Sequence, residues 1–203
     1  MGPVVAKRLL DLAVALPALV ASLPVQAVVA VLVARRLGRP VLFRQPRPGL
    51  GGRPFELVKF RTMRPVDSAR GWTDDASRLT PFGAALRATS LDELPTLWNV
   101  VRGDMSLVGP RPLLMDYLPL YDAEQARRHD VPPGLTGLAQ VSGRNALDWD
   151  DRLRLDVEYV DRHNLRLDLA VMVKTLGSVL RREGITGAGE ATVARFLGSG
   201  SPV

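Results

Sequence analysis

The sequence predicts a mostly helical α+β protein that associates with a membrane. Three observations support this. The chain has 203 residues, 46% of them hydrophobic, which suits one domain with a sizeable core. Residues 12–34 contain no charged side chain. Two short apolar segments, 41–45 and 55–60, flank a linker rich in Gly and Pro, which is typical of a β-hairpin with a long loop.

The uncharged segment is long enough to cross a bilayer. As a helix its 23 residues would extend ~34 Å, against ~30 Å of hydrocarbon. A cleaved signal peptide is disfavoured, because the segment is unusually long and basic residues follow it without a clear cleavage site. Lys7 and Arg8 precede the segment, and Arg35 and Arg36 follow it. Basic residues at both ends favour two cytoplasmic ends, and hence a helix that enters and leaves the membrane on one side.

A proline interrupts the middle of this segment. Pro24 lacks an amide donor and is expected to bend the helix, and Ser22 can hydrogen-bond a carbonyl that the bend frees. Each half would then be too short to span a membrane. A kinked spanning helix fits the same residues equally well, so the residues alone leave both paths open.

The remaining chain is predicted to contain several short elements. Residues 64–80 are expected to form a loop, and 131–145 an irregular segment. The pattern over 152–160 fits a strand or a helix. The tail from Gly184 is rich in glycine and is expected to be loosely ordered. Helices are expected over 82–88, 91–101, 122–129 and 165–182, the last of them amphipathic and interfacial.

Composition excludes several classes of function. The chain has no cysteine and two histidines, which excludes disulfides, thiolate sites and histidine-rich metal cages. His129 lies among charged residues and is expected to be solvated. The formal charge of +6 favours an anionic partner. Aromatic residues make up only 5% of the chain, which argues against nucleic-acid binding by base stacking.

A pair of carboxylates among arginines is the clearest candidate for chemistry. Ser90 and Glu93 have the spacing of a helix capping box, which would make Asp92 and Glu93 ordinary helix-starting residues. Pro95 weakens this interpretation, because proline prefers the first helical position. The alternative is a helix that begins near Leu94 and presents the two carboxylates at its start.

The basic residues near this pair suit phosphate groups. The guanidinium groups of Arg87 and Arg111 can bind phosphate oxygens in a bidentate manner. A carboxylate beside phosphates is also the usual setting for magnesium. Lys59 and Arg61 leave the second predicted strand together, and their alternative interpretation is a solvated strand end.

Several segments in fixed order give the chain a specific resemblance. It resembles the small monotopic phosphoglycosyl transferases, bacterial sugar transferases that start lipid-linked glycan assembly. The matching segments are Lys7-Arg8-Leu9-Leu10-Asp11, Phe43-Arg44-Gln45, Lys59-Phe60-Arg61-Thr62-Met63, Ser90-Leu91-Asp92-Glu93-Leu94-Pro95, Gly109-Pro110-Arg111-Pro112, Pro133-Gly134-Leu135-Thr136-Gly137 and Gln140-Val141-Ser142-Gly143-Arg144-Asn145.

The resemblance implies a two-step transfer. A nucleoside diphosphate sugar, usually a UDP-sugar, would bind with Mg²⁺, and Asp92 would be both its metal ligand and the nucleophile. Undecaprenyl phosphate would then take the sugar phosphate, with Glu93 assisting its proton transfer. Such a reaction divides one difficult phosphoryl transfer into two easier ones. Substrate-binding roles are implied for Arg87, Arg111, Lys59, Arg61, Arg144 and Asp156.

The resemblance also implies a location and a domain plan. Residues 1–36 would form a re-entrant helix–break–helix, held at the membrane by Lys7, Arg8, Ser22 and Pro24. Residues 37–183 would form the catalytic region on the cytoplasmic face of the bacterial inner membrane, and 184–203 a flexible tail. Family members are expected to carry serine directly before the break proline, where this chain has Leu23. Nucleic acid is not an expected partner, whereas a homo-oligomer is compatible with the family.

Two other functions fit the same residues. A magnesium-dependent membrane-bound phosphodiester hydrolase could use the same carboxylates. A basic membrane-surface adaptor would need them only as helix caps. The sequence does not indicate which sugar is transferred.

Overall fold

The computed structural model describes residues 3–143, 147–181 and 195–198. The helices, 3₁₀ helices (η) and strands follow one another as α1 (Pro3–Leu37), β1 (Leu42–Pro48), η1 (Leu50–Gly52), β2 (Pro54–Phe60), η2 (Ser68–Arg70), α2 (Asp75–Arg78), α3 (Pro81–Ala88), η3 (Leu91–Thr96), α4 (Leu97–Arg102), β3 (Ser106–Val108), η4 (Met115–Leu120), α5 (Ala123–Ala126), η5 (Arg127–His129), β4 (Gly134–Thr136), α6 (Leu138–Ser142), α7 (Trp149–Arg162) and α8 (Leu165–Arg181).

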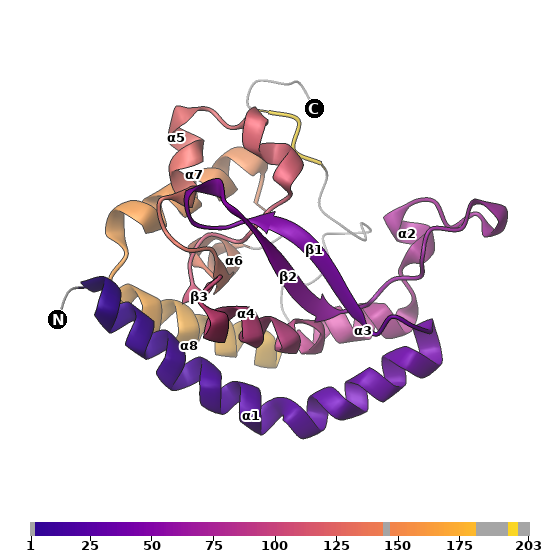
Figure 1. The fold of residues 1–203 in the computed structure, drawn as a ribbon. Helices are drawn as coiled ribbons and strands as arrows, with labels where there is room; N and C mark the ends of the chain where they lie inside the picture. The colour runs from indigo at the N-terminus through magenta and orange to yellow at the C-terminus, as the bar shows by residue number, and fades with distance from the viewer. Residues whose placement is uncertain (1–2, 144–146, 182–194, 199–203) are drawn as a thin grey trace.

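The mostly helical architecture and the hairpin are confirmed. β1 and β2 pair antiparallel, with Leu42 opposite Phe60 and Pro48 opposite Pro54. Gly51 and Gly52 in the connection have positive φ angles of 62° and 72°, which glycine adopts without steric cost. The hairpin crosses the centre of the molecule above α3 and α4 (Figure 1).

The N-terminal helix is one continuous element of 35 residues, with Pro17 and Pro24 in its interior. The expected break is therefore a bend, visible near the middle of α1 (Figure 1). Pro24 has no amide hydrogen for the carbonyl one turn before it. Beside this gap the Ser22 hydroxyl donates to the Leu19 carbonyl at 2.9 Å, and the Gln26 amide donates to Ser22 at 2.9 Å. Ser22 thus finds a carbonyl acceptor, although it is not the Val20 carbonyl that Pro24 leaves without a donor.

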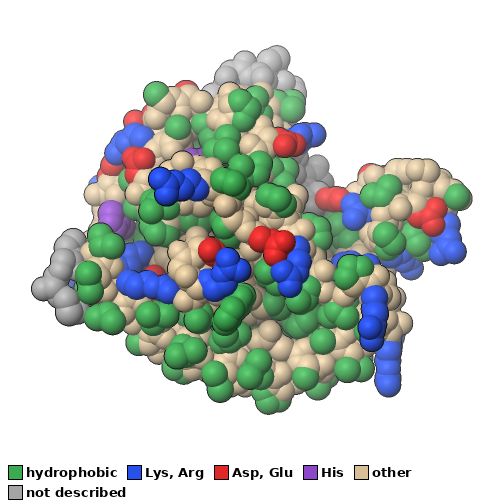
Figure 2. Space-filling model, viewed as in Figure 1, with side chains coloured by type: hydrophobic (Ala, Val, Ile, Leu, Met, Phe, Trp, Pro, Cys, Tyr) green, Lys and Arg blue, Asp and Glu red, His purple; other side chains and the backbone are tan. Residues whose placement is uncertain are grey.

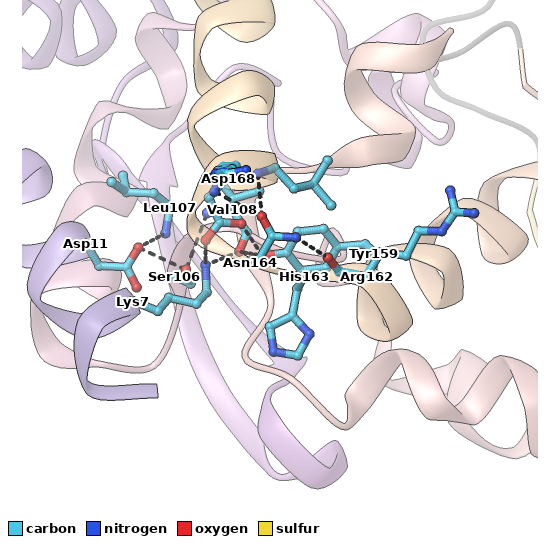
Figure 3. Close-up of polar contacts among 12 residues, drawn as sticks. Lys7, Asp11, Ser106, Leu107, Val108, Tyr159, Arg162, His163, Asn164 and Asp168 are labelled. Carbon is cyan, nitrogen blue, oxygen red and sulfur yellow. Dashed lines mark hydrogen bonds and ion pairs between the residues drawn. The ribbon is translucent and has the colours of Figure 1, made fainter. Parts of the chain in front are cut away.

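The first turns of α1 are fastened to the rest of the protein by buried polar contacts (Figure 3). The Lys7 ammonium donates to the Val108 carbonyl at 3.0 Å and to the Asp168 carboxylate at 2.7 Å. The Asp11 carboxylate accepts from the Ser106 hydroxyl at 2.9 Å and from the Leu107 amide at 3.0 Å. These contacts connect α1 to β3 and α8.

Arg8 adds a second connection, to the end of α4. Its guanidinium donates to the carbonyls of Val100 at 2.6 Å and Val101 at 2.7 Å, which lie in the last turn of that helix. Lys7 and Arg8 were expected to face the membrane surface as basic flanks. Their charged groups bind carbonyls and a carboxylate of the protein, which satisfies these acceptors, and contact of the two residues with a membrane stays a prediction.

The other end of α1 is fastened as well. Arg61, which follows β2, donates to the carbonyl of Leu37 at 2.5 Å and also to that of Gly38. The last carbonyls of a helix have no partners within it, and a guanidinium with several donors satisfies them. Both ends of α1 are therefore bound to the same globular body.

Between its ends α1 packs by one face only. Ala15, Val29 and Val33 are buried against the protein, whereas the other face exposes apolar residues such as Val20 and Leu23. The helix is long and apolar enough to cross a membrane, and most of its surface is uncovered. Along the lower edge of the molecule in Figure 2, where α1 lies, hydrophobic side chains alternate with uncharged atoms, and charged side chains gather only toward the right end. This pattern fits membrane association.

Two segments differ from the prediction, and a third is a helix, which was one of its two alternatives. The loop expected over 64–80 contains the short helix α2, and the ambiguous segment 152–160 lies within α7. The segment expected to be irregular, 131–145, contains α6 and β4, which pairs in parallel with β3. This pairing connects distant segments, and it requires glycine, because a Cβ at Gly134 would lie 2.1 Å from the amide nitrogen of Gly109.

The predicted loose tail, 184–203, lies mostly outside the described residues. Residues 195–198 are described, and there Phe196 is buried against Tyr117 and Trp149, with ring centroids 5.6 and 5.3 Å away.

The contacts of Asp11 predict how much it contributes to the stability of the fold. Asp11→Ala should lower the free energy of unfolding by about 1–3 kcal/mol, because it leaves a buried hydroxyl and a buried amide without their acceptor. Thermal unfolding in detergent micelles measures the loss. The exposed Glu124→Ala serves as control and should change stability by less than ~0.5 kcal/mol. Equal stability of the two variants would contradict this account of the fastening.

Candidate functional site

The carboxylate pair lies in the 3₁₀ helix η3, in its first turn. Ser90, just before it, has a left-handed φ of 55° and makes no side-chain capping bond. The capping-box interpretation is therefore wrong. The Ser90 carbonyl instead accepts from the Glu93 amide at 3.1 Å, and the tighter 3₁₀ turn accommodates Pro95.

Side chains from η3 and α4 fix this turn against strand β2. The Thr96 hydroxyl donates to the Val58 carbonyl at 2.9 Å. The buried Asn99 amide accepts from the Val58 amide at 3.1 Å and donates to the Glu56 carbonyl at 2.7 Å. The backbone on either side of Val58 is thus held by residues that follow Asp92, which brings Lys59 close to the carboxylate.

Asp92 is a buried carboxylate, with 4% of its surface exposed. Burial raises its pKa to about 6, and the charge of the adjacent Glu93 adds to the rise. Lys59, Arg87 and Arg111 act in the opposite direction and favour the ionised form. The three cations therefore offset only part of the cost of burying this charge.

Two of these cations are themselves desolvated. Burial lowers the pKa of Lys59 and of Arg87, against the attraction of Asp92. Arg87 is oriented by a bond from its Nε to the Thr62 hydroxyl at 3.0 Å. The Lys59 ammonium lies 5.5 Å from the centre of the Phe43 ring. Lys59, in strand β2, and Arg87, in helix α3, are therefore both held in position by neighbouring side chains.

Arg111 pairs with the second carboxylate. Its guanidinium donates to Glu93 at 2.5 Å, and this pair raises the pKa of Arg111. The Arg111 side chain is about half exposed, at 47%. A cation that reaches from a carboxylate to solvent can also receive an incoming phosphate.

The backbone that carries Arg111 is held by two arginines that the sequence analysis did not identify. Arg128 donates to the Arg111 carbonyl at 2.7 Å, and Arg47 donates to the Pro112 carbonyl at 3.2 Å. The prolines on each side remove amide donors from this segment, and arginine side chains supply donors for its carbonyls. No spacing rule in the sequence marks these two among so many arginines.

Asp156, predicted to bind substrate, pairs with Arg128 at 2.6 Å. Both side chains are almost fully buried, at 1% and 2% exposure. Asp156 therefore neutralises the arginine that holds the Arg111 carbonyl, and contact with substrate stays a prediction. The neighbouring His129 is buried rather than solvated, and burial lowers its pKa to about 4. The short helix η5 turns it inward, toward the Tyr121 ring.

For two other predicted binding residues the substrate role stays a prediction, although Arg61 lines the cavity described below. The Arg61 guanidinium is engaged with the carbonyls at the end of α1. Arg144 lies outside the described residues.

An open cavity of about 1860 Å³ contains the site. Its charged lining residues include Lys59, Arg87, Asp92, Glu93 and Arg111. Three cations and two carboxylates give this group a formal charge of +1 before a substrate binds, so it favours an anion such as a diphosphate.

The donor set is compatible with magnesium. Among the described residues, no group of three or more carboxylates and histidines could hold a metal by itself. Mg²⁺, however, is commonly bound by one or two carboxylates together with substrate phosphates. Asp92, whose charge is only partly compensated, fits that arrangement beside a bound diphosphate.

Comparison with known proteins identifies relatives over most of the chain. Residues 3–182 match the family described as Bacterial sugar transferase. The uncharacterized sugar transferase EpsL of Bacillus subtilis is 50% identical, with 96% of each chain covered.

Two further relatives carry more specific names. The UDP-glucose:undecaprenyl-phosphate glucose-1-phosphate transferase of Caulobacter vibrioides is 41% identical over 86% of this chain and 69% of its own. The UDP-galactose-lipid carrier transferase of Erwinia amylovora is 40% identical over 88% of this chain. The match spans only 41% of the Erwinia protein's length.

The raised pKa of Asp92 predicts an unusual stability profile. An unfolded aspartate has a pKa of about 3.9. Between about pH 4 and 6, Asp92 is therefore protonated in the folded protein but ionised in the unfolded chain. The contribution of Asp92 to stability is thus most favourable at low pH and is lost as the pH rises through 6. Asp92→Asn should therefore be more stable than the natural protein at about pH 8, by up to ~3 kcal/mol.

Denaturant unfolding at several pH values measures this difference, which should vanish near pH ~4. Glu124→Gln, an exposed change, should show no such trend. If Asp92→Asn is less stable than the natural protein at high pH, then the attraction of Asp92 to the three cations outweighs the cost of burying its charge.

Proposed function

Because the chain belongs to the bacterial sugar transferase family and is a phosphoglycosyl transferase, we propose that it transfers sugar 1-phosphate from a UDP-sugar to undecaprenyl phosphate. The names of the Caulobacter and Erwinia relatives support the substrate classes. One observation carries the proposal for this chain. It is a buried carboxylate surrounded by three cations in a large open cavity.

In the first step an Asp92 carboxylate oxygen attacks the phosphorus that bears the sugar. The bond from that phosphorus to the oxygen bridging the two phosphates breaks, and the nucleoside monophosphate leaves with the bonding electrons. The product is a sugar phosphate joined to Asp92 as an acyl phosphate. Lys59, Arg87 and Arg111 would bind the phosphate oxygens and stabilise the charge that develops on them.

In the second step a phosphate oxygen of the lipid attacks the same phosphorus. The bond to Asp92 breaks, which regenerates the carboxylate and yields a lipid diphosphate sugar. Glu93 is suited to accept the proton of the incoming phosphate, because it lies next to Asp92 in the first turn of η3.

The environment of Asp92 supports its assignment as nucleophile. A buried carboxylate has lost its stabilising water shell, and its negative charge is incompletely compensated. It must nevertheless be ionised to attack, and a pKa of about 6 keeps most of it ionised at neutral pH. Mg²⁺ bound by Asp92 and the diphosphate would neutralise phosphate charge and so assist departure of the nucleoside monophosphate.

The membrane helix is proposed to be re-entrant. Lys7 at one end and Leu37 at the other are both bonded to the same body. A spanning helix would place its ends on opposite sides of ~30 Å of hydrocarbon, and a single body cannot bind both. The bend near Pro24 would then be the deepest part of α1, with the catalytic region on the cytoplasmic face of the inner membrane.

The first step predicts a defined loss of activity. Asp92→Asn should abolish release of nucleoside monophosphate from a UDP-sugar, because an amide is not a nucleophile of this kind. In the natural protein the rate of release should fall as the pH drops below about 6, as Asp92 becomes protonated. Release is measured across a panel of UDP-sugars, with Mg²⁺ and with a chelator. Near-normal turnover by Asp92→Asn would contradict the assignment of Asp92 as the nucleophile.

The proposed topology predicts a labelling pattern. The chain has no cysteine, so single cysteines can be introduced at Val4 and Arg39 without a background. A membrane-impermeant thiol reagent should label both positions in inside-out vesicles and neither in right-side-out vesicles. Cysteine at Leu23 should be protected in both. Labelling of exactly one end in right-side-out vesicles would establish a spanning helix instead.

A further inference from the structure

The cavity that contains Asp92 also has an apolar wall, formed by helix α8. The wall residues are Leu169, Met172, Val173, Leu176 and Val179. Their spacing of three and four residues puts them on one face of the helix, as a stripe ~15 Å long. α8 lies beside the N-terminal half of α1 in Figure 1.

Most of this stripe is turned away from the core, and only its Met172 also packs against it. Asp168 and Val171 are buried, and Asp168 accepts the Lys7 bond that fastens α1. Val173 and Leu176, in contrast, are 61% and 65% exposed although they line the cavity. The core therefore does not require these apolar side chains, and water contact with them is unfavourable.

The cavity is continuous from this stripe to the charged centre. Leu94, Leu97 and Leu135 line the same cavity, as do the cations and carboxylates described above. A ligand that fits both parts carries a phosphate at one end and a hydrocarbon chain at the other. A nucleotide sugar has no such chain, so it does not use the stripe.

We propose that the stripe on α8 binds the isoprenoid chain of the lipid phosphate acceptor, next to its phosphate. This inference rests on the proposed function and extends it by assigning a site to the acceptor. The first isoprene units lie along Leu169, Val173 and Leu176, and the phosphate reaches the cations around Asp92. The stripe thus acts in the second step alone.

The test compares two changes on the same helix face. Val173→Ser/Leu176→Ser makes the stripe polar. Leu165→Ser is the matched control, because Leu165 lies on the same face, is 43% exposed and does not line the cavity. All proteins are placed in nanodiscs with Mg²⁺, a UDP-sugar and undecaprenyl phosphate.

The double variant should raise the KM for undecaprenyl phosphate by ~10-fold or more, because it loses methyl and methylene groups that the bound isoprenoid chain would cover. Its release of nucleoside monophosphate without acceptor should equal that of the natural protein, and Leu165→Ser should be normal in both assays. The natural protein should also prefer long isoprenoid phosphates over short ones, and the double variant should lose this preference.

An unchanged KM in the double variant would overturn the proposal. An equal rise in Leu165→Ser would also overturn it, because the effect would then come from weaker membrane association. Failure of the proposed function has a different signature, in which the natural protein releases no nucleoside monophosphate from any UDP-sugar.

Discussion

The fastening of α1 at both ends is the constraint on which the rest of the structure depends. Lys7 and Asp11 bind β3 and α8 at one end, and Arg61 binds the last carbonyls at the other. Between these points one face of the helix packs on the protein and the other stays apolar and uncovered. A helix held in this way cannot separate from the catalytic region, so the apolar surface and the charged cavity keep a fixed relation.

The candidate site concentrates charges that a stable fold would otherwise avoid. Burial opposes the ionisation of Asp92 and also lowers the pKa of Lys59 and Arg87. The surrounding structure holds these groups in place through Thr62, Asn99 and the Arg128–Asp156 pair, all of which bind backbone or side chains near the centre. Such arrangements are common where a group must react.

Local patterns in the sequence predicted the long helix, the bend-forming Pro24 and the hairpin. The motif around Asp92 predicted Glu93, Arg87 and Arg111 as its neighbours, the family resemblance added Lys59, and the structure brings all of them into one cavity. Contacts between distant segments could not be predicted in this way. The β3–β4 pairing has no local periodicity, and the inward direction of Lys7 and Arg8 depends on carbonyls about a hundred residues away. Arg128 resembles any other arginine until its burial against Asp156 is seen.

The central claim is that Asp92 carries the sugar phosphate between two substrates. Intact-mass spectrometry after incubation with a UDP-sugar and Mg²⁺, without lipid acceptor, tests it most directly. The account predicts a mass increase of one sugar phosphate on the peptide containing Asp92, lost when undecaprenyl phosphate is added and absent in Asp92→Asn. An unmodified chain that still transfers sugar phosphate to the lipid, or an adduct on another residue, would contradict it.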